Sequence, residues 1–504
     1  MENRSIWQAD TVWHGFPCLT GDIKCEVAVV GAGMTGITTA LLLAQAGMDV
    51  AVLEADAVGC GTSGRTTAKI TIQHGLCYQG LSEQRAECYM RANAAGAALI
   101  EALIREHAIQ CDYEKQSSCV YSRGGEDESA LDKELDAYEK LGLKASISIR
   151  TGLPFPVKAA LTLDNQAQFH PLKYLYALAD AAAAAGAQCF ERTRVTGFER
   201  DDTCVLHTPG GQVTASTVIF ATNYPLIEFP GHFFLRLHQE RSYIISADAG
   251  ALSLAGMYIS AEEPVHSVRA ARMGRHTHLL LGGFGHRTGK EDDVGDSYSL
   301  LGRFLQEDFP QAGQEPQYQW SAQDCQPLDG MPYVGAVHTE TPRVYVATGY
   351  NKWGMTNSAA AAAMLSDSIA GSTRIDRETA EAFSPLRFTP CASAKNFFMQ
   401  AGESAGAFTA GYIGLPRGRY EDIASGEGAV LRVEGDAQAV YRDEAGKLHA
   451  FQGSCTHLGC PLEYNALEKS FDCRCHGSRF GVDGQVLTGP AKKPLPRIDT
   501  GDED

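Results

Sequence analysis

Two short segments near the C-terminus each place a cysteine close to a histidine. They are Cys455-Thr456-His457 and Cys473-Arg474-Cys475-His476. Two thiolates and two imidazoles form the ligand set of a [2Fe–2S] centre in which cysteines hold one iron and histidines hold the other. The same groups suit a tetrahedral zinc site. Zinc leaves the additional cysteines Cys460 and Cys475 unexplained, so the pattern favours iron and sulfur.

The two segments resemble the metal-binding loops of the Rieske iron–sulfur family, and the resemblance extends from about Tyr420 to the end of the chain. It implies that the cluster ligands are Cys455, His457, Cys473 and His476. It also implies the disulfide of high-potential members, here between Cys460 and Cys475. Buried free thiols are the alternative for that pair, because disulfides are uncommon in cytosolic proteins.

Hydrogen-bond donors beside the cluster bear on its potential. Ser478 stands where high-potential Rieske proteins have a hydroxyl donor to a bridging sulfide, and Phe480 stands where they have a tyrosine. Because one hydroxyl donor is kept and the other is lost, we expect a reduction potential within the Rieske range of roughly −150 to +300 mV but below the top of that range. The histidine end, His457 and His476, is where we expect electrons to enter or leave.

A glycine-rich turn near the N-terminus predicts a dinucleotide site. The apolar run 26–30 leads into Gly31-Ala32-Gly33-Met34-Thr35-Gly36, and an apolar helix over 37–46 follows. A second strand ends at Glu54, about twenty residues after the turn, which is the spacing of dinucleotide-binding folds. A glycine-rich turn without a ligand is the alternative.

Each residue type in this turn has a physical role. Gly31 permits the tight turn, Gly33 lets the backbone approach a pyrophosphate, and Gly36 lets the helix pack on the strand. The N-terminus of the helix faces the phosphates. Glu54 is expected to accept hydrogen bonds from the ribose hydroxyls, and its charge disfavours a 2′-phosphate.

The following loop, 59–69, favours FAD over NAD. It resembles the second flavin-contacting loop of the D-amino-acid oxidase family of FAD enzymes, which includes sarcosine, glycine and putrescine-type amine oxidases. The resemblance implies further flavin contacts from Ser63, Arg65, Thr66, Thr67, Val195, Thr222, Gly349, Trp353, Gly354, Met355 and Thr356. A helix beginning near Asn357 is expected to aim its positive end at the flavin.

Candidate catalytic residues lie on both sides of the expected flavin. Lys69, Gln73 and His74 follow the second flavin loop, and Lys352 and Trp353 approach from the other side. A solvated or purely structural role is the alternative for each of them. Apart from Cys60, the loop expected to bond the flavin covalently has no cysteine or histidine, which predicts noncovalent FAD.

These features predict a fold class and a domain order. The fold is an α/β Rossmann-like FAD-binding domain with an α+β substrate domain, followed by a small all-β antiparallel Rieske domain. Residues 1–385 are assigned to the oxidoreductase, whose FAD-binding and substrate or cap subdomains are interleaved. Residues 386–418 are assigned to a linker, because 381–418 is rich in Ala, Gly, Ser and Pro. Residues 419–504 are assigned to the Rieske domain.

The charge and the apolar content of the chain restrict the classes of partner that it is expected to bind. The 504 residues carry a net charge of −18, which disfavours binding to nucleic acid and anionic membranes and suits a basic redox partner. No apolar run reaches the roughly 18 residues of a membrane span. The N-terminal 22 residues lack the apolar core of a signal peptide, so a cytoplasmic location is expected.

Joining a flavin site to a Rieske centre predicts a converter of electron pairs into single electrons. The expected enzyme is a dehydrogenase or oxidase that oxidises a C–H bond of an amine or amino acid at the flavin. Electrons then pass through the cluster to an external acceptor protein or quinone. An NAD(P)H-dependent reductase is an alternative, although it should carry a second glycine-rich nucleotide motif. A Rieske oxygenase lacks a suitable mononuclear iron site here. A noncatalytic redox sensor also remains open.

Overall fold

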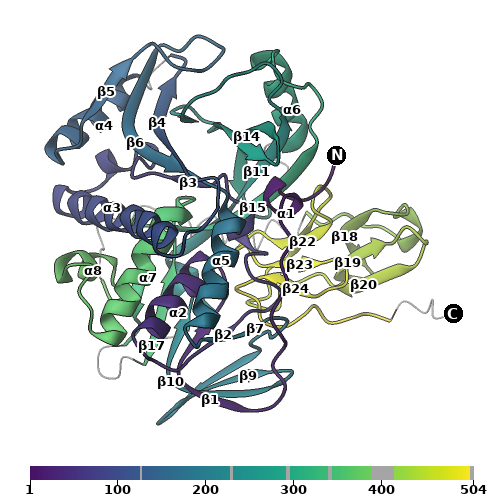
Figure 1. The fold of residues 1–504 in the computed structure, drawn as a ribbon. Helices are drawn as coiled ribbons and strands as arrows, with labels where there is room; N and C mark the ends of the chain where they lie inside the picture. Colours follow the sequence, from purple (N-terminus) through teal and green to yellow (C-terminus); the bar gives the residue numbers. More distant parts are fainter. Residues whose placement is uncertain (125–127, 228–230, 291–295, 339–342, 388–413, 500–504) are drawn as a thin grey trace.

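A computed structural model describes residues 1–124, 128–227, 231–290, 296–338, 343–387 and 414–499. The chain forms two large sheets and a separate C-terminal lobe of small strands, drawn in yellow-green at one side of Figure 1. Among the described residues, no helix is both long enough and apolar enough to cross a membrane.

The first large sheet is mostly parallel and carries the glycine-rich turn. In spatial order its strands are β16 (Tyr333–Ala336), β17 (Val344–Thr348), β10 (Gly211–Phe220), β1 (Ile23–Val30), β2 (Val50–Leu53) and β7 (Gln188–Phe190). Val29 pairs with Val52 on one side and with Ile219 on the other, both in parallel register. Strands β8 (Gly197–Arg200) and β9 (Cys204–Thr208) extend the sheet through β10.

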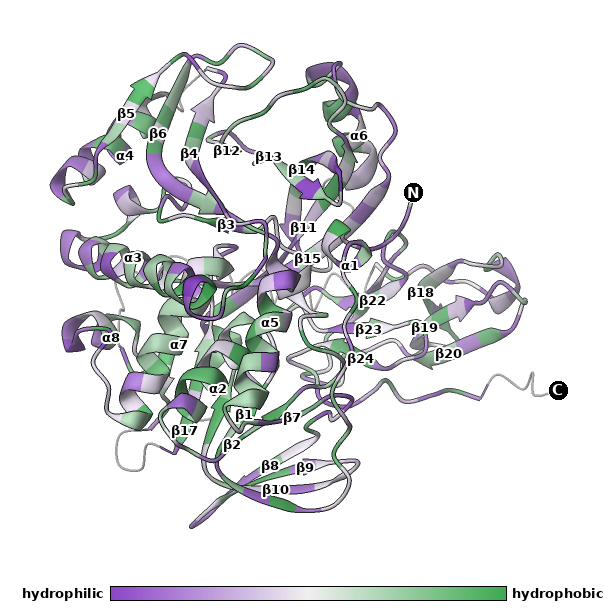
Figure 2. Cartoon of the chain, viewed as in Figure 1, coloured by the Kyte–Doolittle hydropathy of each residue, from purple (hydrophilic) through white to green (hydrophobic). Residues whose placement is uncertain are grey.

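Helices cover one face of this sheet, and a second apolar cluster covers the other. The helices on the sheet are α2 (Met34–Gln45) and α7 (Gly354–Ala370), with α5 (Pro171–Ala184) packed on α2 and α3 (Glu83–Glu106) packed on α7. Val27 and Val29 point into the helical layer, whereas Ala28 and Val30 point into the opposite cluster. Figure 2 shows α2 and the adjoining strands as largely hydrophobic, which fits strands buried on both faces.

The second large sheet is mostly antiparallel. Its strands run in the order β15 (Tyr318–Pro327), β11 (Leu237–Asp248), β14 (His276–Arg287), β13 (Ser267–Met273), β12 (Met257–Ser260), β4 (Glu114–Ser122), β6 (Ala159–Gln168) and β3 (Lys69–Ile70), with β5 (Ala145–Ser148) beside β6. Helix α6 (Ser297–Asp308) packs on β11 and β14, and α4 (Glu128–Lys140) packs near β5. The short helix α1 (Ile6–Ala9) packs against α5, and α8 (Arg377–Phe383) packs against α3 and β16.

The C-terminal lobe consists of two small antiparallel sheets. One contains β18 (Gly428–Val433), β19 (Asp436–Arg442) and β20 (Leu448–Gln452). The other contains β21 (Leu462–Asn465), β22 (Ser470–Cys473), β23 (Arg479–Gly481) and β24 (Val486–Thr488). The predicted fold class, an α/β unit with an α+β partner and a small all-β domain, is confirmed.

Some predicted boundaries differ from the observed ones. The stretch 188–200 contains two strands, β7 and β8, and between them Glu191 accepts hydrogen bonds from Trp13, Phe16 and Val58. Helix α7 begins at Gly354, before the expected Asn357. Most of the predicted linker, 388–413, lies outside the described residues, so the domain boundaries at 385 and 418 stay predictions.

Candidate functional site

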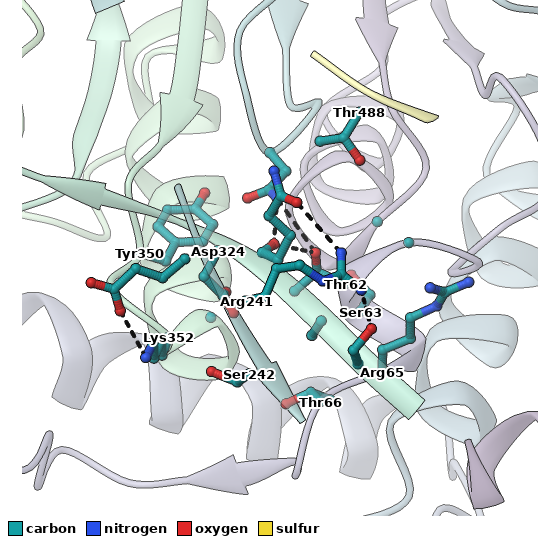
Figure 3. A pocket seen from close by; sticks show the side chains of 18 of the residues that line it. Thr62, Ser63, Arg65, Thr66, Arg241, Ser242, Asp324, Tyr350, Lys352 and Thr488 are labelled. Carbon is teal, nitrogen blue, oxygen red and sulfur yellow. Dashed lines mark hydrogen bonds and ion pairs between the residues drawn. The ribbon is translucent and has the colours of Figure 1, made fainter. Parts of the chain in front are cut away.

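A cavity of about 1190 Å³ lies where the two large sheets and the C-terminal lobe meet. Its walls come from the glycine-rich turn, the 59–69 loop, the start of α7 and strands β11 and β15. In the view of Figure 3, Ser63 and Arg65 lie on one side, Tyr350 and Lys352 lie on the other, and Arg241 and Asp324 lie between them. The cavity is large enough for a dinucleotide together with a small substrate.

The glycine-rich turn is built as the sequence predicts. Gly31 has a φ of +105°, and a Cβ there would lie 2.6 Å from the carbonyl oxygen of Ala221, the residue that follows β10. A Cβ on Gly36 would lie 1.9 Å from the carbonyl oxygen of Gly31. Only glycine permits this closeness. The N-terminus of α2 therefore faces the cavity, where its positive end would suit a pyrophosphate.

Glu54 and Ser63 stabilise the turn from two sides. One Glu54 carboxylate oxygen accepts from the Ala32 N–H at 2.8 Å, and the other accepts from the Asp56 N–H at 3.0 Å. Burial raises the pKa of Glu54, although the two N–H donors oppose that rise. Ser63 Oγ accepts from the Met34 N–H at 3.0 Å. This donor and acceptor set fits the ribose and pyrophosphate of FAD.

Most residues predicted to contact FAD line the cavity. They are Gly31, Gly33, Met34, Thr35, Glu54, Ser63, Arg65, Thr66, Thr67, Val195, Thr222, Trp353, Gly354 and Met355. Three do not line it: Gly36, Gly349 and Thr356. Thr356 is buried instead, with its hydroxyl 3.2 Å from His74 Nε2.

Remote side chains that the sequence analysis missed hold the second flavin loop in place. Trp320 Nε1 donates to the carbonyl of Arg65 at 2.9 Å, and Trp7 Nε1 donates to that of Thr66 at 2.8 Å. Arg269 donates to the carbonyl of Thr67 at 2.7 Å. No local signal in the sequence could link these residues to the loop, because they lie on distant elements.

Lys69 and His74 are both buried and constrained. Lys69 Nζ donates to the carbonyl of Tyr258 at 2.8 Å, and burial lowers the pKa of this amine to about 7, with Arg269 adding to the effect. Burial lowers the pKa of His74 to about 3, so its imidazole is neutral. His74 hydrogen-bonds to Tyr89 at 2.7 Å and stacks on Trp353 with 4.7 Å between ring centroids. Both residues reach the cavity wall.

Lys352 lies in a strained loop immediately before α7. Asn351 and Lys352 have φ values of +53° and +67°, which cost non-glycine residues about 1 kcal/mol or more each. This backbone directs Lys352 Nζ to within 2.8 Å of Glu240 Oε2. Burial raises the pKa of Glu240, but His238 and Lys352 outweigh it and keep the carboxyl ionised.

Asp324 faces the same cavity as this ion pair and lies opposite Glu240 in the register of β11 and β15. Burial raises the pKa of Asp324 to about 6, although the Lys352 cation opposes the shift. Two carboxyl groups and an ammonium therefore meet at one wall. Such a group can hold an ammonium ion or exchange a proton near neutral pH. Glu240 was not a candidate from the sequence.

The four proposed cluster ligands converge in the C-terminal lobe. Cys455 and Cys473 are buried, and their thiols share a hydrogen bond that lowers the pKa of Cys455. The rings of His457 and His476 lie 5.2 Å apart and are perpendicular. Two buried thiols beside two close imidazoles fit the donor set of a Rieske [2Fe–2S] cluster.

A disulfide joins Cys460 to Cys475 and ties the two loops together, with 6.4 Å between the Cα atoms. The predicted disulfide is therefore confirmed, and the free-thiol alternative is not needed. The sulfur atoms of Cys460, Cys473 and Cys475 lie within 4.8 Å of one another. The disulfide is thus placed directly beside a proposed cluster ligand.

The histidine end of the C-terminal lobe packs against the flavin-binding body. Phe234 lies edge-on to both His457 and His476, at centroid distances of 6.0 and 5.9 Å. Gln239 Nε2 donates to the carbonyl of His476 at 2.7 Å, and Gln323 Nε2 donates to that of Gly477 at 2.8 Å. The proposed ligand loop is thus hydrogen-bonded directly to β11 and β15.

Comparison with known proteins agrees with this architecture. Residues 26–368 match the FAD dependent oxidoreductase (DAO) family, and residues 415–499 match the Rieske [2Fe-2S] domain family. A Bacillus subtilis (strain 168) protein described as a Rieske 2Fe-2S iron–sulfur protein, YhfW, is 33% identical over 98% of this chain and 97% of its own.

Two other similarities cover about three quarters of this chain. The γ-glutamylputrescine oxidoreductase of Escherichia coli (strain K12) is 27% identical over 74% of this chain and 89% of its own. The crystal structure of glycine oxidase from Geobacillus kaustophilus matches with a TM-score of 0.61 at 21% identity, covering 73% of this chain and 99% of that one.

Proposed function

The chain belongs to the FAD dependent oxidoreductase family and carries a Rieske [2Fe-2S] domain, and from this premise we propose an amine or amino-acid dehydrogenase that delivers its electrons through the cluster. The substrate is oxidised in the cavity between the two sheets. Its electrons leave one at a time through the loops of Cys455, His457, Cys473 and His476. The final acceptor is an external protein or quinone.

The hydrogen bonds of Gln323 are the main support for the proposed electron route. Thr62, in the second flavin loop, donates to the carbonyl of Gln323 at 3.1 Å, and the Asn223 side chain donates to the same oxygen at 2.9 Å. The Gln323 side chain in turn donates to Gly477, the residue after His476. One residue therefore connects the second flavin loop with the residue that follows a proposed cluster ligand.

The cavity supports a basic substrate. Glu240 and Asp324 present carboxylates to it, and Lys352 balances only one of them. An ammonium group entering this wall would find an anionic partner above the pKa of Asp324, near 6. The relative named as a γ-glutamylputrescine oxidoreductase points to the same class of substrate.

FAD, when bound, would accept the electrons of the substrate C–H bond, and the chain holds it without a covalent bond in our proposal. The glycine-rich turn, Glu54 and Ser63 would hold its dinucleotide part, and α7 would direct its N-terminus at the ring. The Cys60 thiol is unsuited to a covalent link, because burial raises its pKa to about 12. Acid precipitation should therefore release all flavin colour into the supernatant.

Anaerobic stopped-flow mixing with a panel of amines and amino acids tests the proposal. We expect the flavin absorbance to bleach first, followed by the appearance of the reduced-cluster EPR signal. NADH alone should bleach neither centre, and if it does so the reductase alternative is correct. If no amine or amino acid in the panel bleaches the flavin, the proposed function is wrong and a sensor role gains support.

A further inference from the structure

The C-terminal lobe contributes a carboxylate to the wall of the flavin-binding cavity. Glu468 lies between β21 and β22, lines the cavity and is largely buried. Its Oε2 lies 2.8 Å from Arg241 Nη2, on β11 of the other domain. Its Oε1 accepts from the Tyr298 hydroxyl at 3.0 Å. The residue is therefore fixed at the junction by partners from the oxidoreductase.

Arg241, in the cavity wall, is the cation that pairs with the Glu468 carboxylate. Its side chain is 1% exposed, and the guanidinium also donates to Ser321. Among the described residues its Nε–H has no hydrogen-bond partner, although the atom is buried. A buried guanidinium with an unused N–H donor binds a carboxylate strongly, because it can form two parallel hydrogen bonds and because the low dielectric strengthens the attraction between the charges.

The charges around Arg241 are balanced without a ligand. Arg479 lies 3.0 Å from Asp472 and 3.9 Å from Glu468. The group thus contains two cations, Arg241 and Arg479, and two anions, Glu468 and Asp472. Burial raises the pKa of Glu468, but the two arginines outweigh it and lower the pKa below its ordinary value. Glu468 is therefore ionised at neutral pH.

Resting on the proposed function, we propose that Glu468 of the Rieske domain is a specificity-determining residue. It occupies Arg241 in the manner of a substrate carboxylate and so excludes carboxylate-bearing substrates from the cavity. The enzyme then acts on amines that lack a carboxylate at this position. The Rieske domain sets the substrate class in addition to transferring electrons, because one wall of the cavity belongs to it.

Equilibrium titration of the oxidised holoenzyme tests this inference. Acetate, benzoate and benzylamine are added separately, and binding is followed by the perturbation of the flavin absorbance. In Glu468→Gln the four-residue group gains one net positive charge. Its affinity for acetate or benzoate should rise by about tenfold or more, as expected for a buried guanidinium that gains a charged acceptor. Benzylamine should show no such gain.

Three further variants make the test specific. Glu468→Asp keeps the charge and should bind carboxylates as weakly as the wild type, while Glu468→Gln/Arg241→Gln should lose the gain. Glu444→Gln removes an exposed carboxylate of the same domain and serves as the control. The thermal midpoint and the visible cluster spectrum of each variant report its folding.

Unchanged carboxylate affinity in Glu468→Gln would overturn the inference, as would a gain that survives the loss of Arg241. The titration reads binding by the oxidised enzyme and needs no turnover. Its failure is therefore distinct from failure of the proposed function, which would appear as the absence of flavin bleaching by any amine or amino acid.

Discussion

Two side chains beside the cluster loops, Ser478 and Phe480, should affect the reduction potential of the cluster. The Ser478 hydroxyl accepts from the Ala491 N–H at 3.0 Å and donates to the thiol of Cys455, whose pKa it helps to lower. Phe480 is completely buried in β23 and offers no donor. A donor to a ligand sulfur stabilises the reduced, more negative cluster.

Replacing Ser478 by Ala should therefore lower the cluster potential, and Phe480→Tyr should raise it. A difference of about 1 kcal/mol in hydrogen bonding between the two redox states corresponds to roughly 40 mV for one electron. Protein-film voltammetry measures both shifts. If both variants keep the wild-type potential, hydroxyl donors do not control it.

Asp324 should make the stability of the protein depend on pH. The folded carboxyl has a pKa of about 6, raised from 3.8. Its contribution is therefore fully present below about pH 4 and is lost as the pH rises through 6, where a buried charge must form. Asp324→Asn should increase the free energy of unfolding by about 1–3 kcal/mol at pH 7 and leave it unchanged near pH 4.

Thermal unfolding of Asp324→Asn at the two pH values measures this difference. Asp436, exposed at the start of β19, provides the matched control Asp436→Asn. An equal effect of Asp324→Asn at pH 4 and pH 7 would show that packing, and not titration, determines the change.

At the scale of elements, close contact between α3 and α7 positions the start of α7 at the cavity. A Cβ on Gly96 of α3 would lie 2.2 Å from the carbonyl oxygen of Thr356 in α7. Gly96→Ala should therefore separate the helices, destabilise the protein by about 1–3 kcal/mol and weaken FAD retention. Thermal unfolding and flavin content after gel filtration measure the two effects.

Gly302 of α6 is the matched control for this substitution. Apart from its chain neighbours and the adjoining backbone of α6, no atom of the described residues lies within 4 Å of a Cβ placed there. Gly302→Ala should stabilise the protein by about 0.5–1 kcal/mol through helix propensity. If Gly96→Ala behaves in the same way, the close approach of α3 to α7 does not matter for stability.

The elements also show which parts of the site a sequence can predict. The turn at Gly31 and Gly36 follows from local geometry, so motif and structure agree. Between β7 and β8, buried Glu191 accepts hydrogen bonds from Trp13 and Phe16, which lie far away in the chain. No local pattern encodes such a contact.

The same limit applies to the substrate-side wall. Glu240 and Asp324 meet through the register of two strands more than eighty residues apart in the chain, and Glu468 reaches Arg241 only because two domains dock. The cluster motif predicted four ligands, because their chemistry is carried by residue type and spacing. The chemistry of the substrate-side wall depends instead on which residues the tertiary fold brings together, and spacing along the chain does not indicate this.

At the scale of the whole molecule, the docking of the two domains is polar and specific. Gln239 donates to His476 and to Gly489, at 2.7 and 2.8 Å, and Arg287 donates to the carbonyl of Cys475 at 3.1 Å. These bonds hold the loop of the proposed ligand His476 against the edge of the second sheet. The proposed electron route therefore depends on an interface as well as on two cofactor sites.

Gln323 offers a direct test of that dependence. Gln323→Leu keeps the side-chain volume and removes the donor to Gly477 and to Gln239. Only the bond to Gly477 crosses to the C-terminal lobe, and its loss, about 1 kcal/mol, should weaken docking and slow electron transfer to the cluster by about fivefold. The rate of flavin reduction by an amine should stay unchanged, since the backbone carbonyl that Thr62 and Asn223 contact remains.

Anaerobic stopped-flow spectroscopy separates the two steps, because flavin bleaching and cluster reduction have different spectra. Gln485→Leu, at an exposed position of the same lobe, is the control for the substitution itself. If the second step keeps its rate in Gln323→Leu, electrons do not depend on this contact, and the route would instead pass by Phe234, which touches both histidines. If flavin bleaching slows as well, Gln323 acts on the cavity wall, and the interface and the substrate site form one cooperative unit.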